Sequence, residues 1–244
     1  MTDTRQTIVG QRINSSSKSV AAALLARDAT FLQTLARDQE AAGAHALDLN
    51  VSAVCTRAEE PDLLAWLARV VHDVSDLPLC LDSGNAHALA AAAAQCRVAP
   101  IVNSVSPDQI DAGIWDEFDM AREGQRIVVL CTRRALALDL ETRLACAEYV
   151  AARLIDRGVG ESALIFDPLM FPLLSGRQIT ETLWDAIRAL RERWPNAGIL
   201  CASGNYSHGM GDRRLAEREC IALSRSAGGN VFLCETNLFA YNFR

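Results

Sequence analysis

The sequence of 244 residues predicts a single α/β domain, residues 1–244, folded as a (β/α)8 TIM barrel. Short apolar runs alternate with longer amphipathic segments, which is the pattern of a parallel sheet covered by helices. Eight such runs occur, and this number favours a closed barrel over an open doubly wound sheet. No Gly-x-Gly-x-x-Gly motif follows the first run, so a dinucleotide-binding fold is disfavoured.

The predicted strands are apolar runs bounded by turn-forming residues. They cover residues 7–13, 44–51, 78–83, 100–104, 126–132, 163–167, 198–202 and 230–235. Amphipathic spacing predicts helices over residues 28–42, 61–74, 86–96, 107–118, 140–157, 179–194 and 213–227. No Pro-rich or Ser-rich linker interrupts this alternation, which is why we predict one domain.

The end of the chain departs from a regular barrel. Only residues 236–244 follow the last strand, and this is too short for a closing helix of about 11 residues. We therefore predict a shortened or missing last helix. Either another subunit covers that part of the barrel, or the tail covers it with Leu238, Phe239, Tyr241 and Phe243.

Composition and charge exclude several classes of protein. Half of the residues are hydrophobic, and the net charge of −6 argues against a nucleic-acid partner, which would need a basic face. The sequence contains no apolar leader or membrane-length apolar stretch, so we expect a cytoplasmic protein with no membrane partner. The eight cysteines form no Cys-x-x-Cys pair and the four histidines are scattered. We therefore expect buried thiols and no bound metal.

Polar residues follow almost every predicted strand. In a (β/α)8 barrel these strand ends meet at one rim, where the active sites of this fold lie. Some of the residues are explained as helix N-caps or turn formers. The set comprises Asn14, Asp48, Asn50, Asp82, Asn85, Asn103, Ser104, Asp167, Ser203, Asn205 and Glu235.

The chemistry of this set restricts the ligand. Lys and Arg are nearly absent from the same strand ends, so the rim is a poor cradle for a phosphoryl group. A carboxylate accepts two parallel hydrogen bonds from a ring N–H and an adjacent exocyclic amine. A pterin presents such an edge, and the strand ends therefore indicate a pterin or a similar nitrogen-rich heterocycle.

Six strand-end motifs in order carry a resemblance to a known family. They read QRIN, ALDLNV, LCLDSGN, IVNSVS, FDPLMFP and SGNYSHGMGDR. This order resembles the methyltetrahydrofolate:corrinoid/iron-sulfur protein methyltransferases, whose pterin-binding barrel is shared with the folate module of cobalamin-dependent methionine synthases. The resemblance implies a homodimeric pterin-binding barrel of the dihydropteroate-synthase type. It also implies transfer of the N5 methyl of methyltetrahydrofolate, or of a related pterin, to or from Co(I) of a corrinoid carried by a partner protein.

The resemblance assigns roles to residues at matching positions. It implies that the pterin ring is bound by Asp82, Asn103 and Asp167 and that Asn205 faces N5, the leaving nitrogen. Asp48 and Asn50 fall near the same ring, and Ser104 belongs to the Asn103 motif. An amide cannot supply a proton to N5, so either solvent or a network that involves Asp48 or Asp167 is expected to deliver it.

The chain departs from the family pattern at three places. Gln11 replaces the glutamate of the usual Glu-Arg-Ile-Asn, Gly204 precedes the asparagine of the late Ser-Asn motif, and the C-terminal region is short. These departures keep open a folate-binding or regulatory subunit that lacks turnover. A dihydropteroate synthase is a third reading, although the seventh strand ends in Ala-Ser-Gly-Asn without the lysine and arginine that such enzymes use there.

Overall fold

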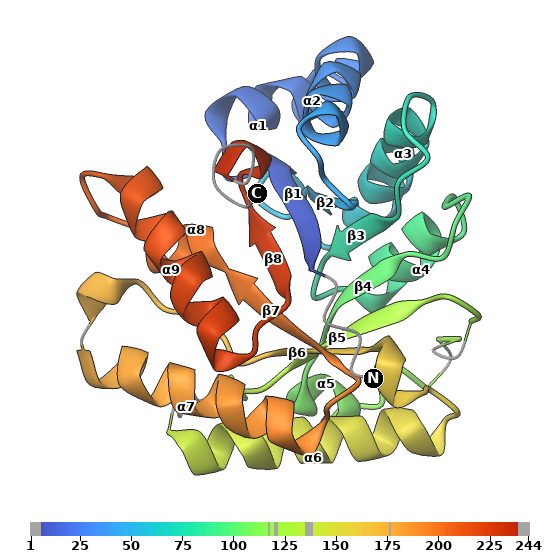
Figure 1. Cartoon of the computed structure of the whole chain (residues 1–244). Coiled ribbons are helices and arrows are strands. Elements are labelled where there is room, and N and C mark those ends of the chain that lie inside the picture. The colour runs from blue at the N-terminus through green and yellow to red at the C-terminus, as the bar shows by residue number, and fades with distance from the viewer. Residues whose placement is uncertain (1–5, 117, 120–121, 135–138, 176, 239–244) are drawn as a thin grey trace. The chain divides into compact units, whose positions relative to one another are not determined.

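The computed structural model describes residues 6–116, 118–119, 122–134, 139–175 and 177–238 (Figure 1). Eight parallel strands close into a barrel in sequence order, which confirms the predicted fold class. The strands are β1 (Thr7–Asn14), β2 (Ala46–Asn50), β3 (Leu79–Asp82), β4 (Ile101–Val105), β5 (Arg126–Leu130), β6 (Leu164–Asp167), β7 (Gly198–Ala202) and β8 (Val231–Cys234).

The chain divides into two compact units. Of the described residues, the N-terminal unit comprises Ile8–Asn103, Arg122–Arg126 and residues 235–238. The C-terminal unit comprises the described residues within 6–7, 104–119 and 127–234.

In the N-terminal unit, β1 to β4 pair in parallel and helices pack beside them (Figure 1). Both faces of β2 are buried, with Leu47 and Leu49 on one face and Ala46 and Asp48 on the other. Helices cover a parallel sheet on one face, and the barrel interior fills the other. Helices α3 and α4 also pack against each other. The helices are α1 (Lys18–Leu25), α2 (Ala29–Ala41), α3 (Glu60–His72) and α4 (Ala86–Ala93).

Strand β1 contains an irregularity in its pairing with β2 between Gly10 and Ile13. The Arg12 N–H donates a 2.8 Å hydrogen bond to Oε1 of the buried Gln39. A Cβ at Gly10 would lie 2.6 Å from that same oxygen, so only glycine leaves room for Gln39. The side chain from α2 thus satisfies a backbone donor at the bulge.

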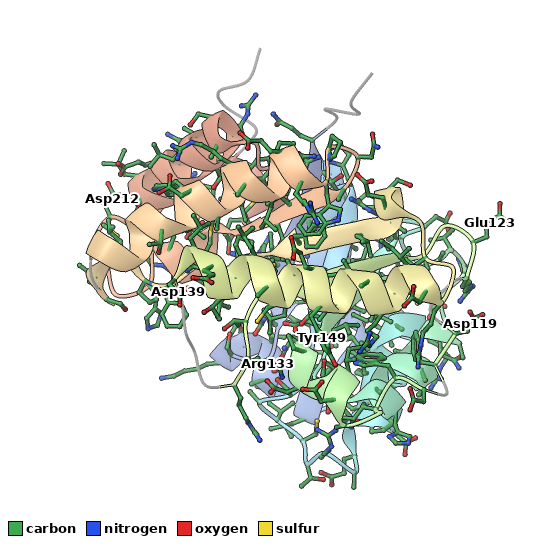
Figure 2. The ribbon with its side chains drawn as sticks, turned by 90° about the horizontal axis from the view of Figure 1, so that it is seen from below. Asp119, Glu123, Arg133, Asp139, Tyr149 and Asp212 are labelled. Carbon is green, nitrogen blue, oxygen red and sulfur yellow. The ribbon has the colours of Figure 1, made fainter. Side chains whose placement is uncertain are left out.

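In the C-terminal unit, β5 to β8 pair in parallel beside α6 (Leu140–Asp156), α7 (Arg177–Arg193) and α9 (Arg213–Ala227). The Phe166 and Trp194 rings stack in its core with centroids 4.4 Å apart. Asp139 and Asp212, labelled in Figure 2, cap α6 and α9 by accepting backbone N–H groups of the first turn.

An exposed ionic network joins the short helix α5 (Pro107–Asp111) to α6. Arg133 donates to Asp111 at 2.6 Å, and the Tyr149 hydroxyl donates to the same carboxylate at 2.5 Å. The Arg133 guanidinium lies 5.5 Å from the centre of the Tyr149 ring, and the two side chains are neighbours in Figure 2. These hydrogen bonds lower the pKa of Asp111.

The structure differs from the predicted elements in three details. The helix predicted over residues 107–118 ends at Asp111, because Gly113 adopts a left-handed backbone with φ 65° and turns the chain away. Helix α1 follows the serine-rich segment after β1, where no helix is predicted. The one-turn helix α8 (Ser203–Tyr206) lies between β7 and α9, where no helix is predicted either.

The C-terminal tail continues from β8 into a short 3-10 turn, η3 (Thr236–Leu238), that belongs to the N-terminal unit. Leu238 is buried, and the Thr236 methyl lies 3.2 Å from where a Gly10 Cβ would stand. The predicted contacts of Phe239, Tyr241 and Phe243 fall outside the described residues. Within the described part, no helix is long and apolar enough to cross a membrane.

Candidate functional site

Strand register brings four of the predicted site residues together in the N-terminal unit. Asn14 is paired with Asn50, Asp48 with Cys80, and Asp82 with Asn103 across neighbouring strands. Because these strands are parallel, their polar ends gather at the same edge of the sheet. Asp48, Asn50, Asp82 and Asn103 form what we call the acid–amide cluster.

Asn50 orients Asp82 within the acid–amide cluster. Its amide nitrogen donates to Oδ2 of Asp82 at 2.9 Å. Its amide oxygen accepts from the Ser15 hydroxyl at 2.8 Å and from the Ser52 hydroxyl at 3.1 Å. Both ends of the amide are therefore occupied, and Asn50 acts on Asp82 instead of offering a free donor to a ligand.

Asp48 is fully buried, and neither carboxylate oxygen has a hydrogen-bond partner among the described residues. Burial raises its pKa well above the ordinary value, and the negative charge of Asp82 raises it further. The Cys80 thiol and the Asn103 amide lie close enough to lower the pKa, but neither completes a hydrogen bond of good geometry. Asp48 therefore holds its proton more strongly than a solvated carboxyl group.

The pKa of Asp82 is also raised, chiefly by burial. The hydrogen bond from Asn50 opposes this shift, while the nearby carboxyl group of Glu60 adds to it. Two carboxyl groups with raised pKa values, Asp48 and Asp82, therefore share the edge at which β2 and β3 end. In such a pair the first proton binds tightly, because two negative charges at short range repel.

Asn85, the other polar residue predicted at the end of β3, has a structural use. It is buried, and its amide donates to the Arg57 carbonyl oxygen at 2.9 Å. Its backbone N–H donates to the Ser83 hydroxyl at 2.9 Å, and Ser83 in turn donates to the buried Glu60 at 2.6 Å. This chain of bonds fixes the start of α4.

The remaining predicted residues belong to the C-terminal unit. Ser104 is half-buried in β4, and Asp167 is half-buried at the end of β6. Asp167 accepts the Leu169 N–H at 2.8 Å, which forms a tight turn after the strand. Leu169 has a φ of 59°, a left-handed conformation that costs a branched residue energy. Asp167 therefore ends its strand in a strained loop.

Asn205 lies in the one-turn helix α8, directly after β7. Its side chain is exposed, and no hydrogen bond from that amide to the described residues is present. Gly204 has no left-handed backbone conformation, so it does not redirect the turn. The amide of Asn205 is therefore available to a ligand.

A buried arginine lies near Asp167. Arg143 of α6 is fully buried, and its Nη1 donates to the Thr182 hydroxyl at 3.0 Å. Within the part of the chain that the structure describes, its Nε and Nη2 have no hydrogen-bond partner. Burial lowers the pKa of Arg143, while the neighbouring Cys131, Asp139 and Asp167 oppose that shift.

Sequence reasoning missed several polar residues that hold the strand ends. These residues are all buried: Ser15 lies just after a strand, and Glu60, Arg143 and Glu217 lie within helices. Their signal is a polar residue on the apolar face of an amphipathic helix. Among the residues that the structure describes, no group of His, Cys, Asp or Glu could hold a metal ion.

Comparison with known proteins identifies related sequences. A family model described as pterin binding enzyme matches residues 10–236. A methylcorrinoid:tetrahydrofolate methyltransferase from Eubacterium limosum is 24% identical over 225 residues, which cover 91% of this chain and 82% of that protein. The methionine synthase of Mycobacterium tuberculosis is 31% identical over 222 residues, which cover 83% of this chain and only 18% of that enzyme.

Solved structures show the same fold. A dihydropteroate synthase from Xanthomonas albilineans with 4-aminobenzoic acid has a TM-score of 0.72 at 17% identity, over 98% of this chain and 90% of that one. The Yersinia pestis enzyme with a pterine-sulfa conjugate has a TM-score of 0.69 at 14% identity, over 97% and 90% of the two chains. The match of the family model over most of the sequence confirms the family resemblance. The chain therefore belongs to the pterin binding enzyme family.

Proposed function

We propose that the protein transfers the N5 methyl group of methyltetrahydrofolate, or of a related methylated pterin, to or from Co(I) of a corrinoid held by a partner protein. The acid–amide cluster is the observation that carries this proposal. Relatives named as a methylcorrinoid:tetrahydrofolate methyltransferase and as methionine synthases support it. The proposal includes a homodimer, which light scattering of the purified protein tests.

The pterin-binding role rests on the chemistry of Asp82 and Asn103. Asp82 uses Oδ2 to accept from Asn50, which leaves its other oxygen to accept from a ring edge. Asn103 pairs with Asp82 across the strands and has both a donor and an acceptor on its side chain. We assign ring recognition to these two residues together with Asp167, with Asn50 as the residue that orients Asp82 and Ser104 as a further contact.

Methyl transfer needs assistance at the leaving nitrogen. As the methyl group bonds to cobalt, the electron pair of the C–N bond stays on N5, which then takes up a proton. A preorganised amide that hydrogen-bonds N5 stabilises this transition state more than the ground state. We assign that role to Asn205. The proton comes from solvent or from a network that includes Asp48 or Asp167, and the raised pKa of Asp48 suits a proton store.

Binding is tested by calorimetry with methyltetrahydrofolate and tetrahydrofolate. Asp82→Ala is expected to weaken binding by about 1.5–3 kcal/mol, because a hydrogen bond to a charged group is lost. Asp73→Ala is the matched control, since Asp73 is an exposed aspartate at the end of α3 and is not part of the acid–amide cluster. No heat of binding with the wild-type protein at high micromolar concentration would contradict the pterin-binding role.

Turnover is tested by mixing the purified protein with methyltetrahydrofolate and reduced cobalamin. Loss of Co(I) absorbance with formation of methylcobalamin is the expected result. Folate binding without transfer to any supplied corrinoid would instead indicate a binding or regulatory subunit. Condensation of 4-aminobenzoate with a pterin pyrophosphate would indicate a dihydropteroate synthase.

A further inference from the structure

The turn that carries Asn205 is fastened to helix α9 by a buried carboxylate. Glu217 lies in the second turn of α9 and is only 4% exposed. Its Oε1 accepts from the Ser207 hydroxyl at 2.9 Å, and its Oε2 lies 3.5 Å from the Ser203 hydroxyl. Ser203 and Ser207 flank Asn205, so one carboxylate reaches both ends of the turn. Helices α8 and α9 pack together, as Figure 1 shows.

The distances around the Ser207 hydroxyl show which acceptor takes its proton. The Ser207 hydroxyl has a single proton, and Glu217 at 2.9 Å is a nearer acceptor than the Gly204 carbonyl at 3.3 Å. Its oxygen remains free to accept from Nε of Arg213 at 3.2 Å. Ser207 is therefore fixed by one donated and one accepted bond.

Arg213 contacts both Glu217 and the turn from the solvent side. Its Nη2 lies 3.7 Å from Glu217 and 3.4 Å from the Gly204 carbonyl oxygen. Its side chain is 54% exposed, so this ion pair contributes little by itself. Glu217 is the buried member of the set, and a buried carboxyl group is tolerated only where hydrogen bonds replace water.

A buried carboxylate at this place is not needed to form α9. Asp212 already caps that helix by accepting the Leu215 N–H at 3.0 Å. The bonds of Glu217 instead run to the turn of residues 203–207, whose one outward polar side chain is Asn205. The contacts thus fix the backbone beneath Asn205 and leave its amide free.

We propose that Glu217 is a positioning residue that holds the turn of residues 203–207 rigid, so that the Asn205 amide is preorganised for the atom it serves. This inference rests on the proposed function for the identity of that atom, N5 of the folate. Preorganisation raises the rate only when the donor stays in place during the reaction, and a displacement of about 1 Å costs about 10²-fold.

Kinetics of three variants test the proposal. Glu217→Ala is expected to lower kcat about 10-fold to 10²-fold while KM and folate affinity change less than about 3-fold. Glu217→Gln keeps an acceptor for Ser207 and is expected to recover most of that loss. Glu219→Ala is the matched control, because Glu219 is an exposed glutamate on the same helix.

Hydrogen exchange of the peptide covering residues 203–208 gives a second readout that needs no activity. Faster exchange in Glu217→Ala, but not in Glu219→Ala, is the expected result. If the wild type transfers no methyl group, the proposed function fails, while this exchange result still tests the fastening of the turn. Unchanged exchange, or a rise in KM with normal kcat, would overturn the positioning role.

A second variant covers the case in which Glu217→Ala does not fold. Ser207→Ala removes the donor on the turn and leaves Glu217 paired with Arg213. We expect the same lowering of kcat and the same faster exchange at residues 203–208. Wild-type values for both measurements in Ser207→Ala would overturn the proposal.

Discussion

The tripeptide Ser-Gly-Asn occurs twice at strand ends, and the protein uses the two copies differently. Ser83-Gly84-Asn85 follows β3 in the N-terminal unit, and Ser203-Gly204-Asn205 follows β7 in the C-terminal unit. In both copies the serine reaches a buried glutamate, Glu60 or Glu217. Asn85 is buried and bonded to the Arg57 carbonyl, whereas Asn205 is exposed with its amide free.

The difference shows that the element following the strand decides whether a strand-end asparagine is buried in a structural role or exposed to a ligand. After β3, the serine hydroxyl accepts the Asn85 N–H and the chain enters α4 at once, so the asparagine turns inward. After β7, the chain makes a separate turn, α8, before α9 begins. Because of that extra turn, Asn205 lies outside the packed core. Ser203 and Ser207, on either side of it, contact the buried Glu217.

Replacing the two asparagines gives the largest predicted contrast. Asn205→Ala is expected to lower methyl transfer by roughly 10²–10³, the effect of losing one preorganised donor, with little change in folate affinity or melting temperature. Single-turnover kinetics and calorimetry measure the two effects. A fully active Asn205→Ala protein would remove this residue from the mechanism.

The acid–amide cluster beside the first copy predicts an unusual pH dependence of stability. Because the folded-state pKa of Asp48 is raised, its stabilising contribution is present below the unfolded-state pKa of about 3.9 and is lost as pH rises through the folded value. Each unit of upward shift corresponds to about 1.4 kcal/mol.

Asp48→Asn removes this titration. The unfolding free energy of the wild type is therefore expected to fall relative to that of Asp48→Asn as pH rises from about 4. Urea unfolding across the pH range measures the difference. Parallel pH profiles for the two proteins would show that Asp48 titrates normally in the fold.

Asn85→Ala, which changes the first Ser-Gly-Asn copy, is expected to lower the stability of the folded protein. Loss of its buried hydrogen bond to Arg57 costs about 1–2 kcal/mol. This loss lowers the melting temperature by about 2–8 °C in a chain of this size. Thermal unfolding measures the change, with Asn205→Ala as the matched variant that keeps the wild-type value. Equal melting temperatures for both variants would contradict the claim that Asn85 stabilises the fold and Asn205 does not.

The serines provide the smallest predicted contrast. Ser83 lies 2.6 Å from Glu60, whereas Ser203 lies 3.5 Å from Glu217, at the limit of a hydrogen bond. Ser203→Ala is therefore expected to cost less than about 1 kcal/mol, and Ser83→Ala more, because it leaves buried polar groups unpaired. Chemical denaturation measures the unfolding free energies of both variants. A larger loss for Ser203→Ala than for Ser83→Ala would contradict this order.

The sequence by itself determined the alternation of strands and helices and the polar strand ends, because both depend on local periodicity and composition. It also predicted the family through motifs that follow the strands, such as those of Asp82 and Asn103. The early end of α5 depended on Gly113, whose left-handed backbone is not encoded by hydrophobic periodicity.

Only the tertiary structure decided what each polar residue does. Asn85 and Asn205 share the same local sequence, and their exposure differs because of the helices that follow them. The raised pKa of Asp48 arises from burial and from Asp82, which is distant in the chain but one strand away in the sheet. Glu217 reads as an ordinary helical glutamate until Ser203 and Ser207 are folded against it. Burial and contacts between distant segments are properties of packing, and a local pattern does not contain them.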